Sequence, residues 1–407
     1  MAMTPPPDAT DTAAPDFPEI FRQYIANSVQ ATLADIPQDD SLLTADTRDR
    51  ALHVLSFALK LEVVWPSTRD LLLLLAPKLE QAGYRDDWWP YLEAGVKLSQ
   101  RCGDRLAEAE LRLQVGRLYH LRSQFDAAGQ QFAISLTRFC TLGDLQGQAR
   151  AHNAFAWLGH LQHRYVEATQ HVEQSLALLS DVDPERAMSC LIQGMLAIDQ
   201  RRWQEAEALH RKALTLFERQ EEHRRIAWSM QNLAYALRGQ KRFEEAISYY
   251  EQAVKRLDQL ADIHSLGMVQ MNLGSTYYYS NKPSEALIHY KQAKLIFNRL
   301  HDELNTAKVY TGLGLGYLAL QMYIEAEDAF SNSIRLFRAL KDNSLRLNSV
   351  DGLVMTYLAS KQYRQAAEVT EQALGELSTI ADAPNYAYLL QSLNQHLAEA
   401  RQGLNIQ

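Results

Sequence analysis

The chain has 407 residues, of which 47% are hydrophobic and 22% are charged. These values are ordinary for a soluble folded protein, with two or three domains or one long repeat array. Its 49 acidic and 41 basic residues give a net charge of −8, which argues against nucleic-acid binding. The three cysteines form no CxxC pair, which excludes a zinc ribbon or a disulfide scaffold and suits a reducing compartment.

The N-terminal segment does not resemble a targeting signal. Residues 1–16 are rich in Pro, Asp and Thr and contain no basic residue, the reverse of a signal peptide. The most apolar run, residues 71–77, is far shorter than the roughly twenty residues of a membrane span. We therefore predict a cytoplasmic protein with a disordered leader over residues 1–16 and no membrane contact.

Most of the chain is organised by a repeat of 38 to 40 residues. An alanine that follows an aromatic residue (once a proline) by three positions marks each copy. The markers are Ala128, Ala168, Ala206, Ala246, Ala286, Ala326 and Ala366. Nearly all residues twelve before and seven after each marker are small, and an acidic residue follows each marker by 15 or 16 positions.

This pattern predicts a helical hairpin repeated along an axis. Small residues are favoured where two helices cross closely, and apolar residues at i, i+3 and i+4 fill the space between them. In the pairs Gly103-Asp104 and Gly143-Asp144, glycine suits the end of one helix and aspartate suits the cap of the next.

These residues resemble the tetratricopeptide repeat, whose L-G-x-x-Y and Y-x-E-A pattern recurs, for example, at residues 272–277 and 323–326. The resemblance implies an all-α superhelix of helical hairpins, an α-solenoid. We expect seven repeats over residues 105–382 and a degenerate repeat over 67–104, with a first helix at 69–82 kinked by Pro77. Capping helices are expected over 17–66 (at 17–34 and 46–64), and a capping helix and tail over 383–407, with its helix at 385–401.

Repeats longer than the usual 34 or so residues resemble those of kinesin light chains, polarity adaptors and bacterial STAND-type regulators. Those regulators carry an ATPase motor upstream of their sensor arm. No GxxxxGK[ST] sequence occurs here, so we expect no motor in this chain.

By resemblance, the first helix of each hairpin lines a concave groove at repeat positions 2, 5, 6, 9, 12 and 13. This frame predicts a peptide- or partner-binding face that includes Trp157, Met195, Trp228, Asn232, Tyr235, Met268, Met271, Asn272, Tyr278, Gly312, Leu315 and Met355. The methionines and aromatic residues either contact a partner helix or peptide, or are buried between neighbouring first helices. Both interpretations are open.

Asn232 and Asn272 occupy the same repeat position, one repeat apart. Because a side-chain amide both donates and accepts, such a ladder can pair with an extended peptide backbone. The alternative is that these amides bond neighbouring helices. Further along, the position becomes Gly312 and Gly352, which we expect to make room for ligand bulk.

The sequence also bears on two other kinds of partner site, a carboxylate clamp and a basic docking edge. The lysine-rich carboxylate clamp of chaperone-binding tetratricopeptide repeats is missing, because its main position reads Leu113, Asn153, Leu191, Gln231, Met271, Thr311 and Asp351. Bases in the turns within hairpins form a basic docking edge that includes Arg201, Arg202, Lys241 and Arg242. Favourable interaction with helix dipoles explains these bases equally well.

No motif for catalysis, metal or cofactor binding is found. The glycine run at 312–316 falls inside a predicted helix, whereas a phosphate loop follows a strand. His160 and His163 lack a third ligand, and the three cysteines are expected to be buried. Besides Glu110, the acids expected in the groove are Asp199 and Asp351, which are too far apart for one site.

The sequence therefore predicts a non-catalytic scaffold or adaptor of a bacterial regulatory system, with a peptide, helix or partner protein in its groove. The alternative is a peptide- or ligand-sensing regulator whose N-terminal helices act as effector. The sequence does not decide the oligomeric state.

Overall fold

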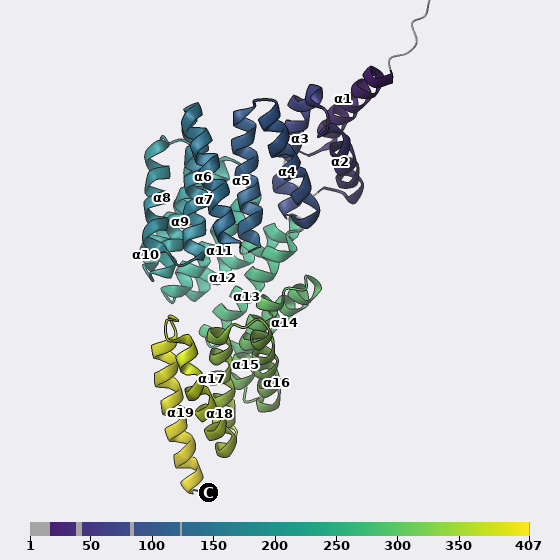
Figure 1. Cartoon of the computed structure of the whole chain (residues 1–407). Coiled ribbons are helices and arrows are strands. Elements are labelled where there is room, and N and C mark those ends of the chain that lie inside the picture. The colour runs from purple at the N-terminus through teal and green to yellow at the C-terminus, as the bar shows by residue number, and fades with distance from the viewer. Residues whose placement is uncertain (1–16, 38–42, 82–84, 123, 407) are drawn as a thin grey trace, which may run out of the picture. The chain divides into compact units, whose positions relative to one another are not determined.

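A computed structural model describes residues 17–37, 43–81, 85–122 and 124–406. It contains two compact units, Met1–Glu185 and Arg186–Gln407. The described residues form α-helices and two short 3-10 helices, with no strand (Figure 1). The predicted all-α fold of helical hairpins is confirmed. The predicted leader lies outside the described residues, and no described helix is long and apolar enough to cross a membrane.

The helices of the first unit are α1 (Phe17–Asp35), α2 (Ala45–Ala58), η1 (Glu62–Val64), α3 (Trp65–Gln81), α4 (Arg85–Arg101), α5 (Arg105–Leu121), α6 (Phe125–Leu142), α7 (Leu145–Leu161) and α8 (Tyr165–Leu178). From α3 to α8 they form three hairpins, in each of which an odd-numbered first helix packs against an even-numbered second helix (Figure 1).

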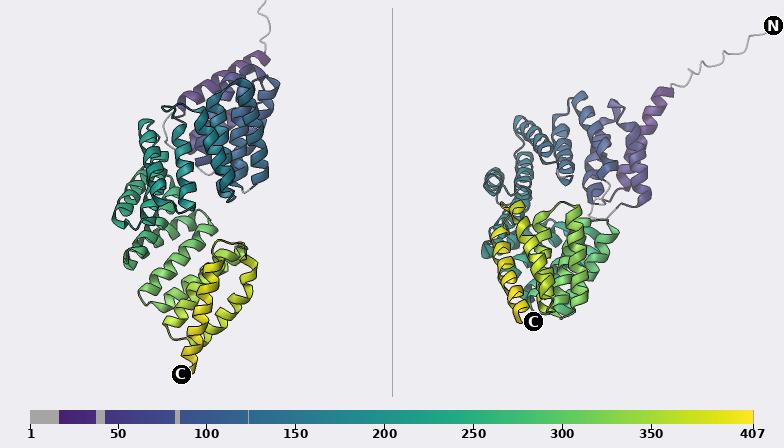
Figure 2. Two further views of the ribbon diagram at one scale, coloured as in Figure 1. Left: turned by 90° about the vertical axis from the view of Figure 1, so that its left-hand side faces the viewer. Right: turned by 60° about the horizontal axis from the view of Figure 1, so that its bottom comes forward.

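The helices of the second unit are α9 (Arg186–Asp199), α10 (Trp203–Arg219), α11 (His223–Gly239), α12 (Phe243–Gln259), α13 (Ile263–Tyr279), α14 (Pro283–Arg299), α15 (Glu303–Ala319), α16 (Tyr323–Ala339), α17 (Asn343–Ala359), α18 (Tyr363–Glu376), η2 (Leu377–Ile380) and α19 (Tyr386–Ile406). Five hairpins run from α9 to α18. Figure 2 shows α19, in yellow, beside α17 and α18, against which it packs.

The helices near the two ends differ in detail from the predicted ranges. Instead of one helix over residues 46–64, α2 ends at Ala58 and α3 begins at Trp65. Pro66 suits the start of α3, because proline has no backbone N–H and fits best in the first turn of a helix. Pro77 lies inside α3, which continues to Gln81. At the other end, α19 extends about one turn beyond the predicted end, to Ile406.

The small residues of the repeat make room for rings. A Cβ atom added to Gly116 of α5 would lie 2.4 Å from the ring of Phe132 on α6. The ring of Tyr290 on α14 similarly lies between two first helices, since added Cβ atoms would lie 2.9 Å from it at Gly274 and 2.5 Å at Gly312. Both rings are buried, and burying a side chain of this size stabilises by roughly 2 kcal/mol.

Buried serines join the two helices of some hairpins at the position seven after the marker. The hydroxyls of Ser135 and Ser333 donate to the carbonyl oxygens of Ala109 and Ala307, at 2.8 and 2.9 Å. Each bond reaches from the second helix to the first helix of the same hairpin. Because the acceptor is a main-chain carbonyl, the serine fixes how the two helices are shifted along each other.

Aspartates cap the first helices as predicted. Gly103 and Gly143 have φ angles of 69° and 68°, in the left-handed region that glycine favours. The next residues, Asp104 and Asp144, accept hydrogen bonds from the backbone N–H of Ala107 and Gly147, at 3.0 and 2.8 Å. Each pair therefore ends one helix and starts the next.

We expect Gly116→Ala to destabilise the first unit by about 1–3 kcal/mol, because the new methyl group would overlap the buried Phe132 ring. Gly129→Ala in α6 is the matched control, since its methyl would lie 3.7 Å from the nearest atom, a side-chain carbon of Leu158. That variant should be neutral or more stable by up to about 1 kcal/mol. Urea unfolding monitored by circular dichroism measures both. Equal stability of the two variants would contradict the ring-slot packing.

Candidate functional site

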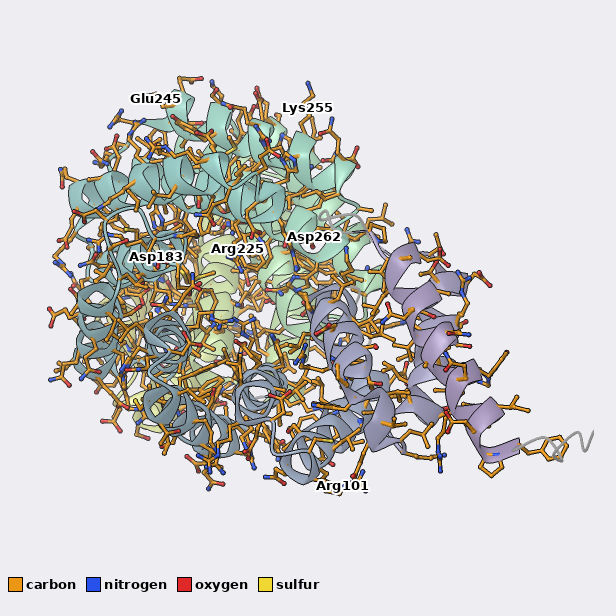
Figure 3. All side chains as sticks on the ribbon, turned by 90° about the horizontal axis from the view of Figure 1, so that it is seen from above. Arg101, Asp183, Arg225, Glu245, Lys255 and Asp262 are labelled. Carbon is orange, nitrogen blue, oxygen red and sulfur yellow. The ribbon has the colours of Figure 1, made fainter. Side chains whose placement is uncertain are left out.

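The predicted face falls mostly in the second unit. Its residues there are Met195 on α9; Trp228, Asn232 and Tyr235 on α11; Met268, Met271, Asn272 and Tyr278 on α13; Gly312 and Leu315 on α15; and Met355 on α17. Trp157 is on α7 of the first unit. Figure 3 shows Glu245 and Lys255 of α12 at the outer edge, whereas Arg225 of α11 and Asp262, which caps α13, lie further inside. First and second helices thus present different surfaces. We call the surface formed by the first helices of the second unit, with the predicted residues above, the first-helix face.

The two asparagines on this face have uncommitted amides. Asn232 and Asn272 are half-buried, and no described residue hydrogen-bonds to either side chain. Asn153 in the first unit contrasts with them, because it is buried and its Nδ2 donates to Oε1 of Glu185 at 2.9 Å. The amide of Asn153 is therefore bonded within the protein, whereas the amides of Asn232 and Asn272 have no hydrogen-bond partner among the described residues. That these two amides form a ladder for a peptide stays a prediction.

The large side chains of the face are only partly exposed. Trp228 is half-buried, donates from Nε1 to the Ser265 hydroxyl at 3.2 Å and lies 4.9 Å from the guanidinium of Arg224. Met268 and Met271 pack against the core cluster around Tyr290. Part of each of these side chains packs inside the protein, and the rest of its surface is accessible to a partner. Met355 is 37% exposed.

Gly312 does not have the role that the sequence suggested. It is buried, and an added Cβ atom would lie 2.5 Å from the ring of Tyr290. Gly352 is buried in the same way against Phe330, at 2.4 Å. Glycine at this position makes room for a ring of the preceding hairpin and not for ligand bulk.

Two of the acids expected in the groove are held by internal partners. Glu110 accepts a bidentate ion pair from Arg150, one repeat further along the first unit. Asp351 is only 4% exposed and accepts from the Ser392 hydroxyl at 2.9 Å. His396 also lies 3.1 Å from the Asp351 carboxylate, so α19 covers this acid.

Half of the predicted basic edge is paired with glutamates. Arg202 forms an ion pair with Glu205, and Arg242 lies 2.7 Å from Glu245, three residues ahead in each case. Arg201 and Lys241 are exposed, with φ angles of 56° and 61°. They occupy the left-handed turn positions after helix C-termini, where the helix dipole favours a positive charge.

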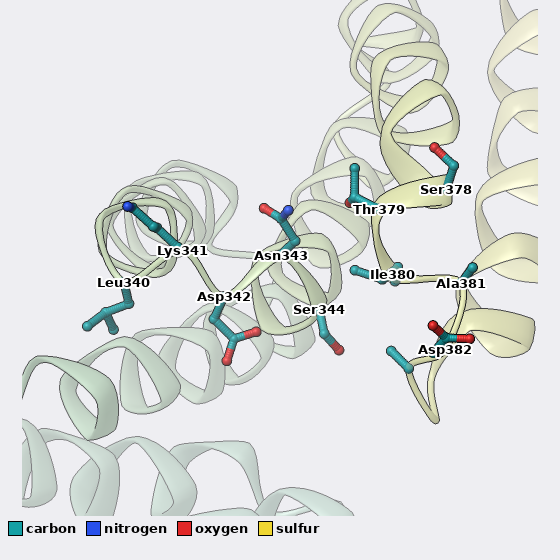
Figure 4. A pocket seen from close by; sticks show the side chains of 11 residues that line it. Leu340, Lys341, Asp342, Asn343, Ser344, Ser378, Thr379, Ile380, Ala381 and Asp382 are labelled. Atoms are coloured by element: carbon teal, nitrogen blue, oxygen red, sulfur yellow. The ribbon is translucent and has the colours of Figure 1, made fainter. Parts of the chain in front are cut away.

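The pocket in Figure 4 is lined by none of the residues predicted for the binding face. It has a volume of about 590 Å³ and lies between the turn at residues 340–344 and the segment 378–383. Its carboxylates are Asp342, which caps α17, and the exposed Asp382. Among the described residues, no group of three or more His, Cys, Asp or Glu side chains is placed to hold a metal ion.

Comparison with known proteins agrees with this geometry. A family model described as the tetratricopeptide repeat matches residues 187–259, which run from the second residue of α9 to the end of α12. The chain has a tetratricopeptide-repeat fold. A comparison with curated protein sequences finds no match.

Several solved structures are similar to this tetratricopeptide-repeat chain. A Rap protein in complex with competence and sporulation factor matches with a TM-score of 0.56 and 15% identity, over 82% of this chain and 99% of the other. A STAND protein with a tetratricopeptide-repeat sensor, from Pyrococcus horikoshii, matches with a TM-score of 0.61 and 11% identity, over 97% of this chain and 65% of the other. The apo form of the quorum sensor NprR, from B. thuringiensis, matches with a TM-score of 0.54 and 15% identity, over 72% of this chain and 81% of the other.

The sequence reasoning missed some features of the tetratricopeptide-repeat array. Arg238 stands at position 12 of the repeat frame, so the frame itself could have found it. His152 and His171 face each other in the first unit with their Nδ1 atoms 3.0 Å apart, and burial followed by the neighbouring His171 lowers the pKa of His152 to about 4. The cysteine expectation was wrong in part, since Cys190 is buried but Cys102 and Cys140 are exposed.

His210 in the second unit is a fully buried histidine with a strongly lowered pKa. It stands four residues after its marker, where other hairpins have Phe132, Tyr290 or Phe330, and it packs on Gly194. It is 0% exposed, and this burial lowers its pKa from 6.5 to about 3. The fold therefore requires the neutral imidazole.

We expect the second unit to lose stability in mild acid because of His210. A histidine whose folded pKa is lowered contributes its full stability above pH 6.5, and this is lost as the pH falls, by about 1 kcal/mol per pH unit. His210→Phe, which places a ring common at this position, should remove that slope between pH 6.5 and 5. Urea unfolding at several pH values measures it. An unchanged slope in the variant would show that other groups carry the acid sensitivity.

Proposed function

We propose that the second unit is a non-catalytic binding scaffold that holds an extended peptide or a segment of a partner protein along α11 and α13. The observation that carries the proposal is the pair of uncommitted amides at Asn232 and Asn272. An extended backbone presents N–H and C=O groups at regular intervals, and each amide offers it both a donor and an acceptor. A peptide bound there satisfies groups that the protein itself leaves open.

The structural likeness gives this proposal independent support. One similar protein was crystallised with competence and sporulation factor, and another is described as a quorum sensor. At 15% identity the likeness shows the fold alone. It supports a regulatory binding role in a bacterial system, and it leaves the ligand to be found from this chain's own residues.

A second candidate function rests on α1. Four side chains on consecutive turns of this helix are exposed in spite of being apolar: Phe17 at 73%, Ile20 at 55%, Phe21 at 47% and Tyr24 at 67%. A stripe of this kind is typical of a protein-interaction surface. It favours the alternative in which the chain senses a ligand and its N-terminal helices act as effector.

The double variant Asn232→Ala/Asn272→Ala tests the scaffold. We expect a partner recovered with the wild-type chain from its native host, identified by mass spectrometry, to bind the variant at least about tenfold more weakly, because two hydrogen-bonding amides are lost. Asn332→Ala is the matched control, since Asn332 lies on second helix α16 and its Nδ2 donates to the carbonyl of Asp328 in the same helix.

Both variants must first give the wild-type circular dichroism spectrum and melting temperature. If the partner binds the folded double variant as well as the wild type, the first-helix face is not its site. The exposed stripe of α1 then becomes the surface to test, by Phe17→Ser/Phe21→Ser.

A further inference from the structure

An arginine on α11, the helix that carries Asn232, lies over two tyrosine rings. The guanidinium carbon of Arg238, near the end of α11, lies 4.2 Å from the ring centroid of Tyr235 and 5.8 Å from that of Tyr279. The ring of Tyr278 lies 5.5 Å from Tyr279, edge to face. Because α11 packs against α13, residues of both helices build one cluster, which we call the Arg238 cluster.

The Arg238 cluster is accessible. Arg238 and Tyr235 are half-buried, and Tyr279 is 62% exposed. The guanidinium carbon lies over the rings of Tyr235 and Tyr279. Contact with a ring face does not use the N–H donors of arginine, which lie at the edge of the guanidinium plane.

The charge of Arg238 is unbalanced, unlike that of its neighbours. Arg224 lies 2.7 Å from Asp262, and Arg242 and Arg211 each lie 2.8 Å from Glu207. For Arg238, the described residues supply no carboxylate within ion-pair distance.

The surrounding hydroxyls add further donors. Burial raises the pKa of the Tyr278 phenol, and the neighbouring Tyr279 and Tyr388 raise it further. This hydroxyl therefore stays protonated at neutral pH and can donate. Tyr388 belongs to α19 and is itself 62% exposed.

We propose that the Arg238 cluster binds a carboxylate of the peptide held on the first-helix face, an inference that rests on the function proposed above. The planar donor fork of arginine matches the two oxygens of a carboxylate, and contact with the tyrosine rings restricts the side chain before binding. The carboxylate comes either from the C-terminus of the peptide or from an Asp or Glu side chain. Position 12 of the repeat frame, where Arg238 stands, is also different from the position of the chaperone-binding clamp, which reads Gln231 and Met271 on these two helices.

The probes are four pools of random eight-residue peptides. One pool has free C-terminal carboxylates and lacks Asp and Glu, and the second is the same pool with amidated ends. The third and fourth are amidated, with one Asp or one Asn at a varied position. The retained peptides are measured by affinity selection and mass spectrometry.

We expect wild-type protein to retain the free-acid pool or the Asp pool at least about tenfold above its amide counterpart. Whichever pool shows the preference identifies the source of the carboxylate. Arg238→Gln should abolish the preference while keeping the weaker binding of the amide pools. Arg299→Gln on second helix α14, which removes the same charge from an exposed position outside the cluster, should leave the preference unchanged.

Two results overturn the inference while the proposed function stands. One is equal retention of acid and amide pools by wild-type protein. The other is a preference that survives in folded Arg238→Gln. The proposed function fails separately if no pool is retained above background, or if folded Asn232→Ala/Asn272→Ala retains the amide pools as well as the wild type.

Discussion

The fold depends on aromatic rings that fill slots of small residues between neighbouring first helices. In α14 the ring of Tyr290 meets Gly274 of its own hairpin and Gly312 of the next, and in α16 Phe330 meets Gly314 and Gly352 in the same way. A ring shared between two successive first helices fixes both the hairpin and the stacking of one hairpin on the next. Rings and slots therefore recur at matching repeat positions, although Val172 and Thr370 stand where other hairpins carry a ring.

This dependence explains which parts of the structure the sequence predicts well. Nearly all slot positions hold small residues, so they show as regular columns over some 250 residues, and all seven marker alanines are 0% exposed. Caps are predictable for a similar reason, since Asp104 needs only a backbone N–H three residues ahead, which is a local relation.

Properties set by more distant neighbours are less predictable. Glycine at 312 looks like room for a ligand until the position of Tyr290 is known, because a sequence does not show toward which helix a ring leans. The burial of Asp351 depends on Ser392, about forty residues later, and the ion pairs that distinguish Arg242 from Arg238 depend on Glu207 in the preceding hairpin. The frame did place Asn232 and Asn272 together, but whether their amides are free is a fact of the packing.

Many polar groups of the first helices are bonded within the protein. In the first unit Glu110 pairs with Arg150, Asn153 with Glu185 and His152 with His171 of α8, and in the second unit Asp351 accepts from Ser392. A network satisfied within the protein rigidifies the helices that carry it and offers little to a ligand. In the second unit, Asn232, Asn272 and Arg238 keep their donors open, although an unpaired polar group near the core usually costs stability. The three lie on two neighbouring helices, and under the proposed function a partner that pairs with them offsets that cost on binding. On that proposal, the same repeat serves as framework where its polar groups are internally satisfied and as a recognition surface where they are not.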